Sequence, residues 1–587
     1  MGTEKFEADP FESERINADT LFKKGAYDEA KQAYQSILSR DPNNSKALNN
    51  LGALHEHNRE AHQARSLYRK ACVLAKPGSV QRNVFLNNFA RISISTADWH
   101  SAIWAYETMI ESEIDIGYET AVMYLKTLEK LMLGNSQYST TKCLEKLLRI
   151  KDIDSQAVAD LYFQQVSNDN DLRYNGSTIF GTIKSLLDKY PLALSLMDQH
   201  IIANPRIELL LDDFCEAIRT RNTNTEISDE CKCILAATAK QNLLSGNIRF
   251  ECDRHNCHLE SKNRPINHTK NSRALDLTAR GRLSSYRIPR RIKEFYELYP
   301  YPLWTSTPLH TISKIDQYFT QTGINTRTVS NGKDTILVAG CGTGRHAIQL
   351  ALTFPESQII GIDISLSSLL YARQKKNECN IKNVRFIQCS IFDIGKLGLK
   401  FKIIECIGVL HHLKQPTRAL KLLVSVLAHG GIVKLGLYSR SARQPLVHLK
   451  RECARAKIDY IPENLQAIRK LALKLSPDSI KPLINSRDFY SLEGCMDLLF
   501  NPVEQQFTIG GILNIVTTLK LDFAGFDCTH INGKPPFASF GDFTDPKPFF
   551  EKWHSFELEN PSTFSQMYLF WIRPGKAHEN HQLQHGA

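Results

Sequence analysis

The stretch "TILVAGCGTGRHAIQLA", residues 335–351, decides the fold of the second half of the chain. An apolar run of strand length, 335–339, leads into three glycines at Gly340, Gly342 and Gly344. The following residues have helical periodicity, and Pro355 stands just beyond them. The pattern predicts a buried strand, a tight turn and a helix, as at the first crossover of a parallel α/β sheet.

Length and composition predict two or three domains. The 587 residues exceed the roughly 250–300 that one hydrophobic core can serve. With 42% hydrophobic and 23% charged residues, the chain has the composition of a globular protein. The net charge of +11, from 73 basic and 62 acidic residues, is a small excess for this length and gives little indication of a nucleic-acid partner.

Neither a membrane span nor a signal peptide is predicted. No apolar run reaches the roughly 18 residues that a span needs, and residues 1–15 are acidic without an apolar core. Fourteen cysteines in such a chain suggest free thiols and a cytoplasmic location. Their densest patch, "CDRHNCH" at 252–258, lacks a second ligand pair at zinc spacing, so we expect no metal site.

The N-terminal third repeats with a period of 34 residues. A small residue is followed four positions later by an aromatic one at Ala30 and Tyr34, at Ala64 and Tyr68, and, after 38 residues, at Ala102 and Tyr106. The four extra residues fit around 75–79. This segment resembles a tetratricopeptide-repeat array, which implies stacked helix–turn–helix units over 11–150.

The array precedes four further regions. We predict a helical extension at 151–251, a polar linker at 252–285, a second domain at 286–575 with a helical insertion at 441–485, and a disordered tail at 576–587. The repeats are expected to bind a protein or peptide partner in a concave groove. A scaffold or oligomerisation surface without a dedicated ligand is the alternative.

The glycine turn does not match a dinucleotide-binding loop. That motif is G-x-G-x-x-G, and its last position here is Arg345 or Ala347, depending on the starting glycine. The G-x-G-x-G spacing resembles that of class I methyltransferases, which use S-adenosylmethionine. The resemblance implies a Rossmann-like sheet of seven strands whose last strand, "MYLFWIRP" at 567–574, is antiparallel. We expect the glycines to remove Cβ atoms from the surface that meets the cofactor.

Asp363 is the second mark of this family. It ends the next predicted strand, 23 residues after Gly340, close to the spacing of about 20 for an acid that binds the ribose hydroxyls. A role as N-cap of the following helix is the alternative. The resemblance implies cofactor contacts at Gly340, Cys341, Gly342, Thr343, Gly344, Asp363, Ile364, Ser390, Ile391 and Ile407.

Two positions depart from the family pattern. Val338 stands where an acid normally orients the amino group of the cofactor, and Lys402 stands where an aspartate is usual. Glu405 or a backbone carbonyl is left as the candidate partner of that amino group.

The chemistry is assigned to the run "VLHHL" at 409–413, which also resembles the family. His411 and His412 are candidates for the base that takes a proton from the acceptor. Packing or capping of the next helix is the alternative for each. Candidate substrate residues are Tyr438, Arg440, Tyr301 and Trp304. The last two belong to an aromatic strip, "EFYELYPYPLW" at 294–304, expected to be extended and to cover the cofactor or to join the domains.

The whole chain resembles an uncharacterised bacterial type in which tetratricopeptide repeats precede a class I methyltransferase domain. This implies methyl transfer to an oxygen or carbon of a small molecule, or to a protein presented by the repeats. The Asn-Pro-Pro-Tyr motif of amino-methylating enzymes does not occur in the sequence. A non-catalytic interaction protein with a vestigial cofactor fold is the alternative, followed by a dinucleotide oxidoreductase.

Overall fold

A computed structural model gives the fold in two parts. It describes residues 11–112, 116–133, 141–150, 153–168, 179–200, 202–220, 290–304, 334–475, 479–527, 546–561 and 567–575, with the single residues 306–308, 310, 313, 315, 319, 563 and 564. The chain divides into two compact units, 1–173 and 174–587, and each is described by itself. The cysteine patch at 252–258, the predicted linker and the predicted tail lie outside the described residues.

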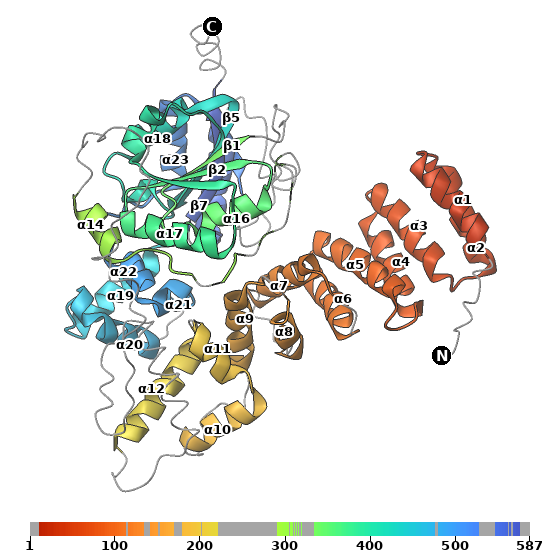
Figure 1. The fold of residues 1–587 in the computed structure, drawn as a ribbon, viewed down its shortest axis with the longest axis horizontal. Coiled ribbons are helices and arrows are strands. Elements are labelled where there is room, and N and C mark those ends of the chain that lie inside the picture. The colour runs from red at the N-terminus through yellow and green to blue at the C-terminus, as the bar shows by residue number, and fades with distance from the viewer. Residues whose placement is uncertain are drawn as a thin grey trace. The chain divides into compact units, whose positions relative to one another are not determined.

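The first unit is a series of paired helices (Figure 1). These helices are α1 (Glu12–Lys23), α2 (Tyr27–Arg40), α3 (Ser45–His57), α4 (Ala61–Leu74), α5 (Val80–Ser95), α6 (Trp99–Glu111), α7 (Tyr118–Leu133), α8 (Thr141–Leu147) and α9 (Ser155–Asn168). Helix α1 packs on α2, α3 on α4 and α5 on α6. The unit therefore has the predicted helix–turn–helix order.

The buried positions explain the repeat. The three small residues of the repeat are fully buried, and the three tyrosines that follow them are at most 2% exposed. At Gly52, an added Cβ would lie only 3.0 Å from the Tyr68 ring, so the aromatic side chain fills the space that the glycine leaves. Residues 75–79 form the connection between α4 and α5, so the extra four residues lengthen a turn and leave the helices intact.

Three further helices stand at the start of the second unit: α10 (Ile179–Lys189), α11 (Ala193–Gln199) and α12 (Pro205–Thr220). Glu208 of α12 accepts two hydrogen bonds from Arg469, at 2.7 and 2.9 Å. Leu209 of the same helix packs on the hydrophobic cluster formed by residues between 446 and 499. Helix α12 is thus tied to the later part of the chain, although the sequence suggested an extension of the repeats. The predicted boundaries at 150, 251 and 285 remain predictions.

The second unit is built on a seven-stranded sheet (Figure 1). The strands are β1 (Thr335–Ala339), β2 (Gln358–Asp363), β3 (Val384–Gln388), β4 (Phe401–Ile407), β5 (Leu427–Tyr438), β6 (Leu521–Phe526) and β7 (Met567–Pro574). Their order is β3-β2-β1-β4-β5-β7-β6, and β7 runs antiparallel to both of its neighbours, β5 and β6. This confirms the predicted fold class, including the direction of the last strand.

Helices cover both faces of the sheet. On one face α16 (Arg345–Thr353) and α17 (Leu366–Glu378) pack on aliphatic side chains of β1, β2 and β4. On the other face lie α18 (Pro416–Ser425), α23 (Ile509–Thr518) and α24 (Lys547–Glu559). The carboxyl ends of β1, β2, β3 and β4 therefore open at one edge, where ligands bind in sheets of this kind.

An insertion follows β5. It contains α19 (Gln444–Arg455), α20 (Leu465–Leu475), α21 (Lys481–Ile484) and α22 (Leu492–Phe500), which share a hydrophobic cluster. Its helices extend beyond residue 485, the end that the sequence suggested. None of the helices in the described part of the chain has the length and apolar character that a bilayer span requires.

Candidate functional site

The glycine turn is built to fit against protein. Its three glycines have φ values of 73°, 51° and 83°, which side chains disfavour. An added Cβ would lie 2.4 Å from Val409 Cγ2 at Gly340, 2.5 Å from the Tyr301 carbonyl oxygen at Gly342, and 2.6 Å from Ala372 Cβ at Gly344. Each missing Cβ therefore leaves room for a neighbouring part of the chain, and the expectation that these glycines also clear a surface for a ligand stays a prediction.

Gly408, at the end of β4, is the glycine that faces open space. Its φ is 76°, and an added Cβ would meet no protein atom within 4 Å. Gly408 also lines a cavity of about 470 Å³ at the carboxyl ends of the strands. This is a volume suited to a ligand the size of a nucleoside with a side chain.

Most of the predicted cofactor residues line this cavity. They are Gly340, Cys341, Gly342, Asp363, Ile364, Ser390, Ile391 and Ile407. Thr343 and Gly344 do not line it. Thr343 is fully buried and its hydroxyl donates to the Pro302 carbonyl, so it holds a neighbouring segment instead.

Asp363 links the two loops at this end of the cavity. One carboxylate oxygen accepts from the Gly342 amide at 2.8 Å and the other from the Ser365 amide at 2.9 Å. Burial raises the pKa of Asp363, against the opposing effect of these backbone donors. Ser365, whose hydroxyl accepts from the Ser368 amide, is the N-cap of α17, so the N-cap alternative for Asp363 does not hold.

An aromatic strap, residues 290–304, covers the glycine turn. Its first part is the helix α14 (Arg290–Leu298), so the expectation of an extended strip is wrong for 294–298. Trp304 Nε1 donates to the Thr343 carbonyl at 3.1 Å, and the Tyr301 carbonyl occupies the space beside Gly342. Tyr301 and Pro302 line the cavity, whereas Trp304 is buried outside it.

The strap is also fastened to α17. The Glu297 carboxylate accepts from the Leu366 amide at 2.9 Å and from the Ser367 amide and hydroxyl at 3.0 and 2.6 Å. Burial raises the pKa of Glu297, but these donors outweigh it and the pKa lies below its usual value. An anion at the N-terminus of α17 is stabilised there by the helix dipole as well. The strap is thus a fixed wall of the cavity, which supports its predicted role beside the cofactor.

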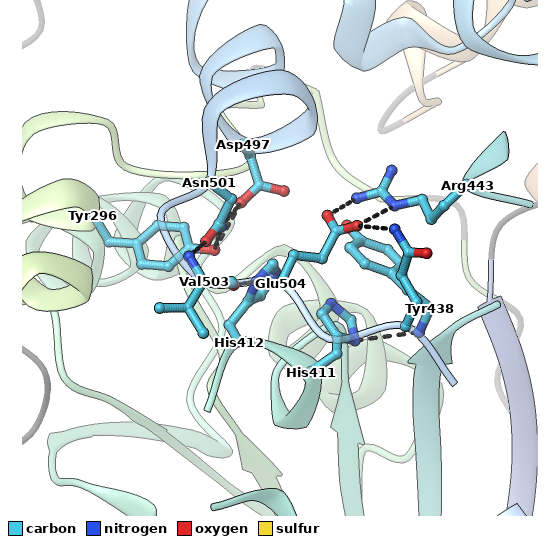
Figure 2. A network of polar contacts seen from close by, with 10 residues as sticks. Tyr296, His411, His412, Tyr438, Arg443, Asp497, Asn501, Val503 and Glu504 are labelled. Carbon is cyan, nitrogen blue, oxygen red and sulfur yellow. Dashed lines mark hydrogen bonds and ion pairs between the residues drawn. The ribbon is translucent and has the colours of Figure 1, made fainter. Parts of the chain in front are cut away.

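The two histidines that follow β4 lie differently from each other (Figure 2). His412 lines the cavity, and its Nδ1 lies 2.7 Å from the Val503 carbonyl. Because a carbonyl only accepts, Nδ1 carries the hydrogen and Nε2 is left with the lone pair. His411 does not line the cavity and is fully buried. Burial holds the pKa of His411 well below its usual range, and the charges of His412 and Arg443 lower it further. A hydrogen bond with the Gly436 backbone raises the pKa but does not offset these effects.

Tyr438 lies between two flat groups. The His411 ring stacks on it at 3.7 Å, and the Arg443 guanidinium lies 3.7 Å from its ring centroid. Arg443 is held by two hydrogen bonds to the Glu504 carboxylate, one of 3.0 Å from Nε. Tyr438 lines the cavity, so His411 supports a cavity residue from behind. Arg440 is exposed and lies outside the lining.

A carboxylate from the insertion completes this end. Asp497 of α22 lines the cavity and accepts from the Tyr296 hydroxyl at 2.7 Å and from Asn501 Nδ2 at 3.0 Å (Figure 2). Behind it, Asp488 interacts with the Tyr301 hydroxyl, and burial raises the pKa of Asp488 to about 6. We call Gly340, Gly342 and Asp363 the glycine end, and Tyr296, His412, Tyr438 and Asp497 the histidine end.

Sequence reasoning missed several lining residues: Tyr296, Arg345, His346, Gln349, Gly408 and Asp497. Arg345, His346 and Gln349 follow the glycine turn on α16 and could have been expected to face the cavity from their position. Asp497 lies 134 residues after Asp363, and nothing in its neighbourhood marks it as part of the site.

Comparison with protein families agrees with this geometry. A model described as a methyltransferase domain matches residues 330–486, which include the glycine turn, Asp363 and both histidines. Residues 330–486 are a methyltransferase domain. A tetratricopeptide-repeat model matches residues 33–66. The predicted combination of tetratricopeptide repeats and a methyltransferase domain is confirmed at the level of the families.

The chain has curated relatives of several kinds. An uncharacterized protein from Synechococcus sp. is 37% identical over 124 residues, 21% of this chain and 30% of the relative. One from Rickettsia prowazekii is 33% identical over 127 residues, 21% of this chain and 48% of the relative. A tRNA U34 carboxymethyltransferase from Campylobacter jejuni is 24% identical over 185 residues, 29% of this chain and 62% of the relative. The chain thus spans less than two thirds of each of these curated relatives.

Among solved structures, PKMT2 from Rickettsia typhi in complex with AdoHcy is 16% identical. The match covers 47% of this chain and 55% of that one, with a TM-score of 0.34. This score is too low to carry an argument, so the assignment depends on the family models and on the site itself.

Proposed function

We propose that this protein transfers a methyl group from S-adenosylmethionine to an acceptor held at the histidine end. The observation that carries the proposal is one cavity with two chemically different ends inside a methyltransferase domain. The glycine end offers the Asp363 carboxylate, because the Gly340 and Gly342 amides already donate to Ile362 and Asp363. The histidine end offers an imidazole nitrogen, phenol groups and a carboxylate.

The residues present fit the cofactor. Asp363 already accepts one hydrogen bond on each oxygen, and each oxygen has a further lone pair for a ribose hydroxyl. Ile364, Ile391 and Phe392 offer an apolar slot for the adenine beside Ser390. Gly408 leaves open space in the cavity wall. When bound, the cofactor supplies an electrophilic methyl group on a sulfonium sulfur.

The chain itself orients the acceptor and excludes water. The aromatic strap closes the cavity above the glycine turn, so the reacting groups are shielded. Tyr438 is held rigidly between His411 and Arg443 and can fix the acceptor with its hydroxyl. His412 Nε2 can take the proton that the nucleophile loses.

The histidine end favours an acceptor that brings hydrogen-bond donors or positive charge. Asp497 lines the cavity and Asp488 stands behind Tyr301, so two carboxyl groups lie at this end. Such an end disfavours a polyanion, so we do not extend the tRNA activities named for some relatives to this chain. The acceptor atom is proposed to be an oxygen or carbon of a small molecule, or part of a protein side chain.

The protein alternative depends on the repeats. We propose that they bind a protein or peptide partner, as tetratricopeptide repeats offer surfaces for such partners. Asn88 Nδ2 donates to Asn49 Oδ1 at 3.0 Å, so polar amides bridge α3 and α5 within this unit. Amide side chains of this kind can hydrogen-bond a peptide backbone.

The test has two stages. Calorimetry with S-adenosylhomocysteine should show binding, and a lysate supplied with labelled S-adenosylmethionine should contain species that gain one methyl group, found by mass spectrometry as metabolites or proteins. Binding without any methylated species would favour the non-catalytic alternative. A clear preference for a nicotinamide dinucleotide would overturn the proposal.

Once an acceptor is found, the histidines can be separated. His412→Ala should lower kcat by about 100-fold or more, the usual contribution of a general base. His411→Phe keeps a flat ring beneath Tyr438 and should lower kcat by less than about tenfold. Equal kcat for His412→Ala and the wild type would remove His412 from the mechanism.

A further inference from the structure

Val338 leaves a gap in the chemistry of the glycine end. It lines the cavity at the position where the resemblance implies an acid, and its side chain cannot accept a hydrogen bond. The amino group of the cofactor's methionine portion carries a positive charge that needs an acceptor in a partly enclosed site. A substitute must therefore come from another element.

The sheet register brings an acid to the neighbouring position. Val338 on β1 pairs with Glu405 on β4, and Glu405 pairs with Lys434 on β5. Side chains that pair in register point to the same face of a sheet. Glu405 thus stands on the same face as Val338, one strand away, under α16.

Glu405 is a buried anion in a layer that is apolar apart from Lys434 and its partner Asp527. It is 1% exposed, and the neighbours on this face include Ile336, Ile403 and Ile432. Burial raises the pKa of Glu405, but Lys434 and then His346 outweigh it, so the pKa lies below its usual value. Lys434 also forms an ion pair with Asp527 at 2.7 Å, so its positive charge is shared between Glu405 and Asp527. A buried charge of this kind is costly to keep, and packing alone does not require it.

His346 connects this acid to the cavity. Its Nε2 lies 2.7 Å from Glu405 Oε2, whereas its side chain is 37% exposed and lines the cavity. Because the carboxylate accepts, Nε2 carries a hydrogen, and in the neutral imidazole Nδ1 then holds the lone pair. A carboxylate behind an imidazole fixes the tautomer and makes the free nitrogen a better acceptor, as it does for histidines that bind metals.

We propose that His346, oriented by Glu405, accepts a hydrogen bond from the amino group of the bound methionine portion and replaces the acid missing at Val338. This inference rests on the proposed use of S-adenosylmethionine. His346 contacts the cofactor. Glu405 lies outside the cavity lining and is a positioning residue.

The test compares two ligands that differ in the amino-acid portion. S-adenosylhomocysteine has the amino and carboxylate groups, and 5′-methylthioadenosine lacks both. Calorimetry on the full chain should show that His346→Phe and Glu405→Gln bind S-adenosylhomocysteine about tenfold more weakly, with methylthioadenosine affinity unchanged within about twofold. His429→Phe, at an exposed histidine outside the cavity lining, is the matched control and should bind both ligands as the wild type does.

A rescue distinguishes positioning from general damage. Adding Val338→Asp to Glu405→Gln should restore at least half of the lost free energy of binding, because the acid returns to the glycine end. An equal loss for both ligands, or no loss in His346→Phe, would overturn the inference alone. Wild-type protein that binds neither ligand would overturn the proposed function as well. His346 is partly exposed, so its variant is informative even if Glu405→Gln does not fold.

Discussion

The two ends of the cavity are built in different ways. The glycine end comes from one run of chain, 335–363, and its contacts are made largely by backbone amides. The histidine end joins segments far apart in sequence, since Tyr296 and Asp497 are separated by 201 residues. Its contacts are made by side chains. The glycine end should therefore respond to changes in backbone shape, and the histidine end to changes in charge.

The largest effect is expected from Gly340→Ala. The new methyl group would lie 2.4 Å from Val409 in a backbone with φ of 73°, so overpacking and strain should together lower the free energy of unfolding by about 2–4 kcal/mol. Gly408→Ala has similar strain without the clash and should lose about 1–2 kcal/mol. Denaturant melts of both variants measure the difference, and equal losses would contradict the packing role of Gly340.

Next is Asp488→Asn at the histidine end. Its pKa of about 6 exceeds the unfolded value near 3.9, so the folded state holds the proton more tightly and stability falls as the pH rises from about 4 to 6. The variant should be about 2–3 kcal/mol more stable than the wild type at pH 8 and equal to it near pH 3.5.

Thermal melts across that pH range check the Asp488 prediction. Asp459→Asn, at an exposed aspartate of the same insertion, is the control and should show no such trend. If the difference in stability between the wild type and Asp488→Asn were the same at all pH values, the pKa of Asp488 would not be raised by folding.

Asp363→Ala should affect binding by about 1–3 kcal/mol. The ribose hydroxyls lose their acceptor, and the Gly342 and Ser365 amides lose theirs. Calorimetry with S-adenosylhomocysteine should show a 5- to 150-fold loss at roughly that energy. Asp363→Asn keeps one carbonyl oxygen, so its affinity for S-adenosylhomocysteine should lie between those of the wild type and Asp363→Ala. Unchanged affinity in both variants would make the ribose assignment wrong.

The smallest change is expected for Arg443→Lys. Lysine keeps the charge but loses the paired hydrogen bonds to Glu504 and the flat contact with Tyr438. KM for the acceptor should rise about fivefold, or roughly 1 kcal/mol, while affinity for S-adenosylhomocysteine stays the same. Arg440→Lys, nearby but exposed, should change neither quantity. An effect of Arg443→Lys on the cofactor alone would reverse the assignment of the two ends.

The sequence predicted those parts whose signal is local. The repeat helices, the first strands and most of the glycine end follow from periodicity, glycine spacing and Asp363, whereas the seven-stranded sheet with its antiparallel β7 was implied by the family resemblance. The sequence could not decide which of His411 and His412 is the candidate base. The two residues are adjacent, and only the structure shows that His412 lines the cavity and His411 does not. Asp497 could not be found, since its role depends on a helix of the insertion folding back to Tyr296.

The sequence also could not show why glycines stand at these positions. A glycine marks a place without a side chain, but the pattern does not say whether a ligand or another segment uses that space. Here the Tyr301 carbonyl of the strap occupies the space beside Gly342. The strap itself carried aromatic residues but no motif that indicated this contact.

The strap has a consequence for turnover. It presses on the glycine turn through Tyr301 and Trp304, and through Tyr296 it also supplies a hydroxyl to Asp497 at the other end. One piece of chain thus borders both ends of the cavity. Exchange of the spent nucleoside should require departure of the methylated product first, and steady-state kinetics should follow an ordered sequence with the nucleoside binding first and leaving last.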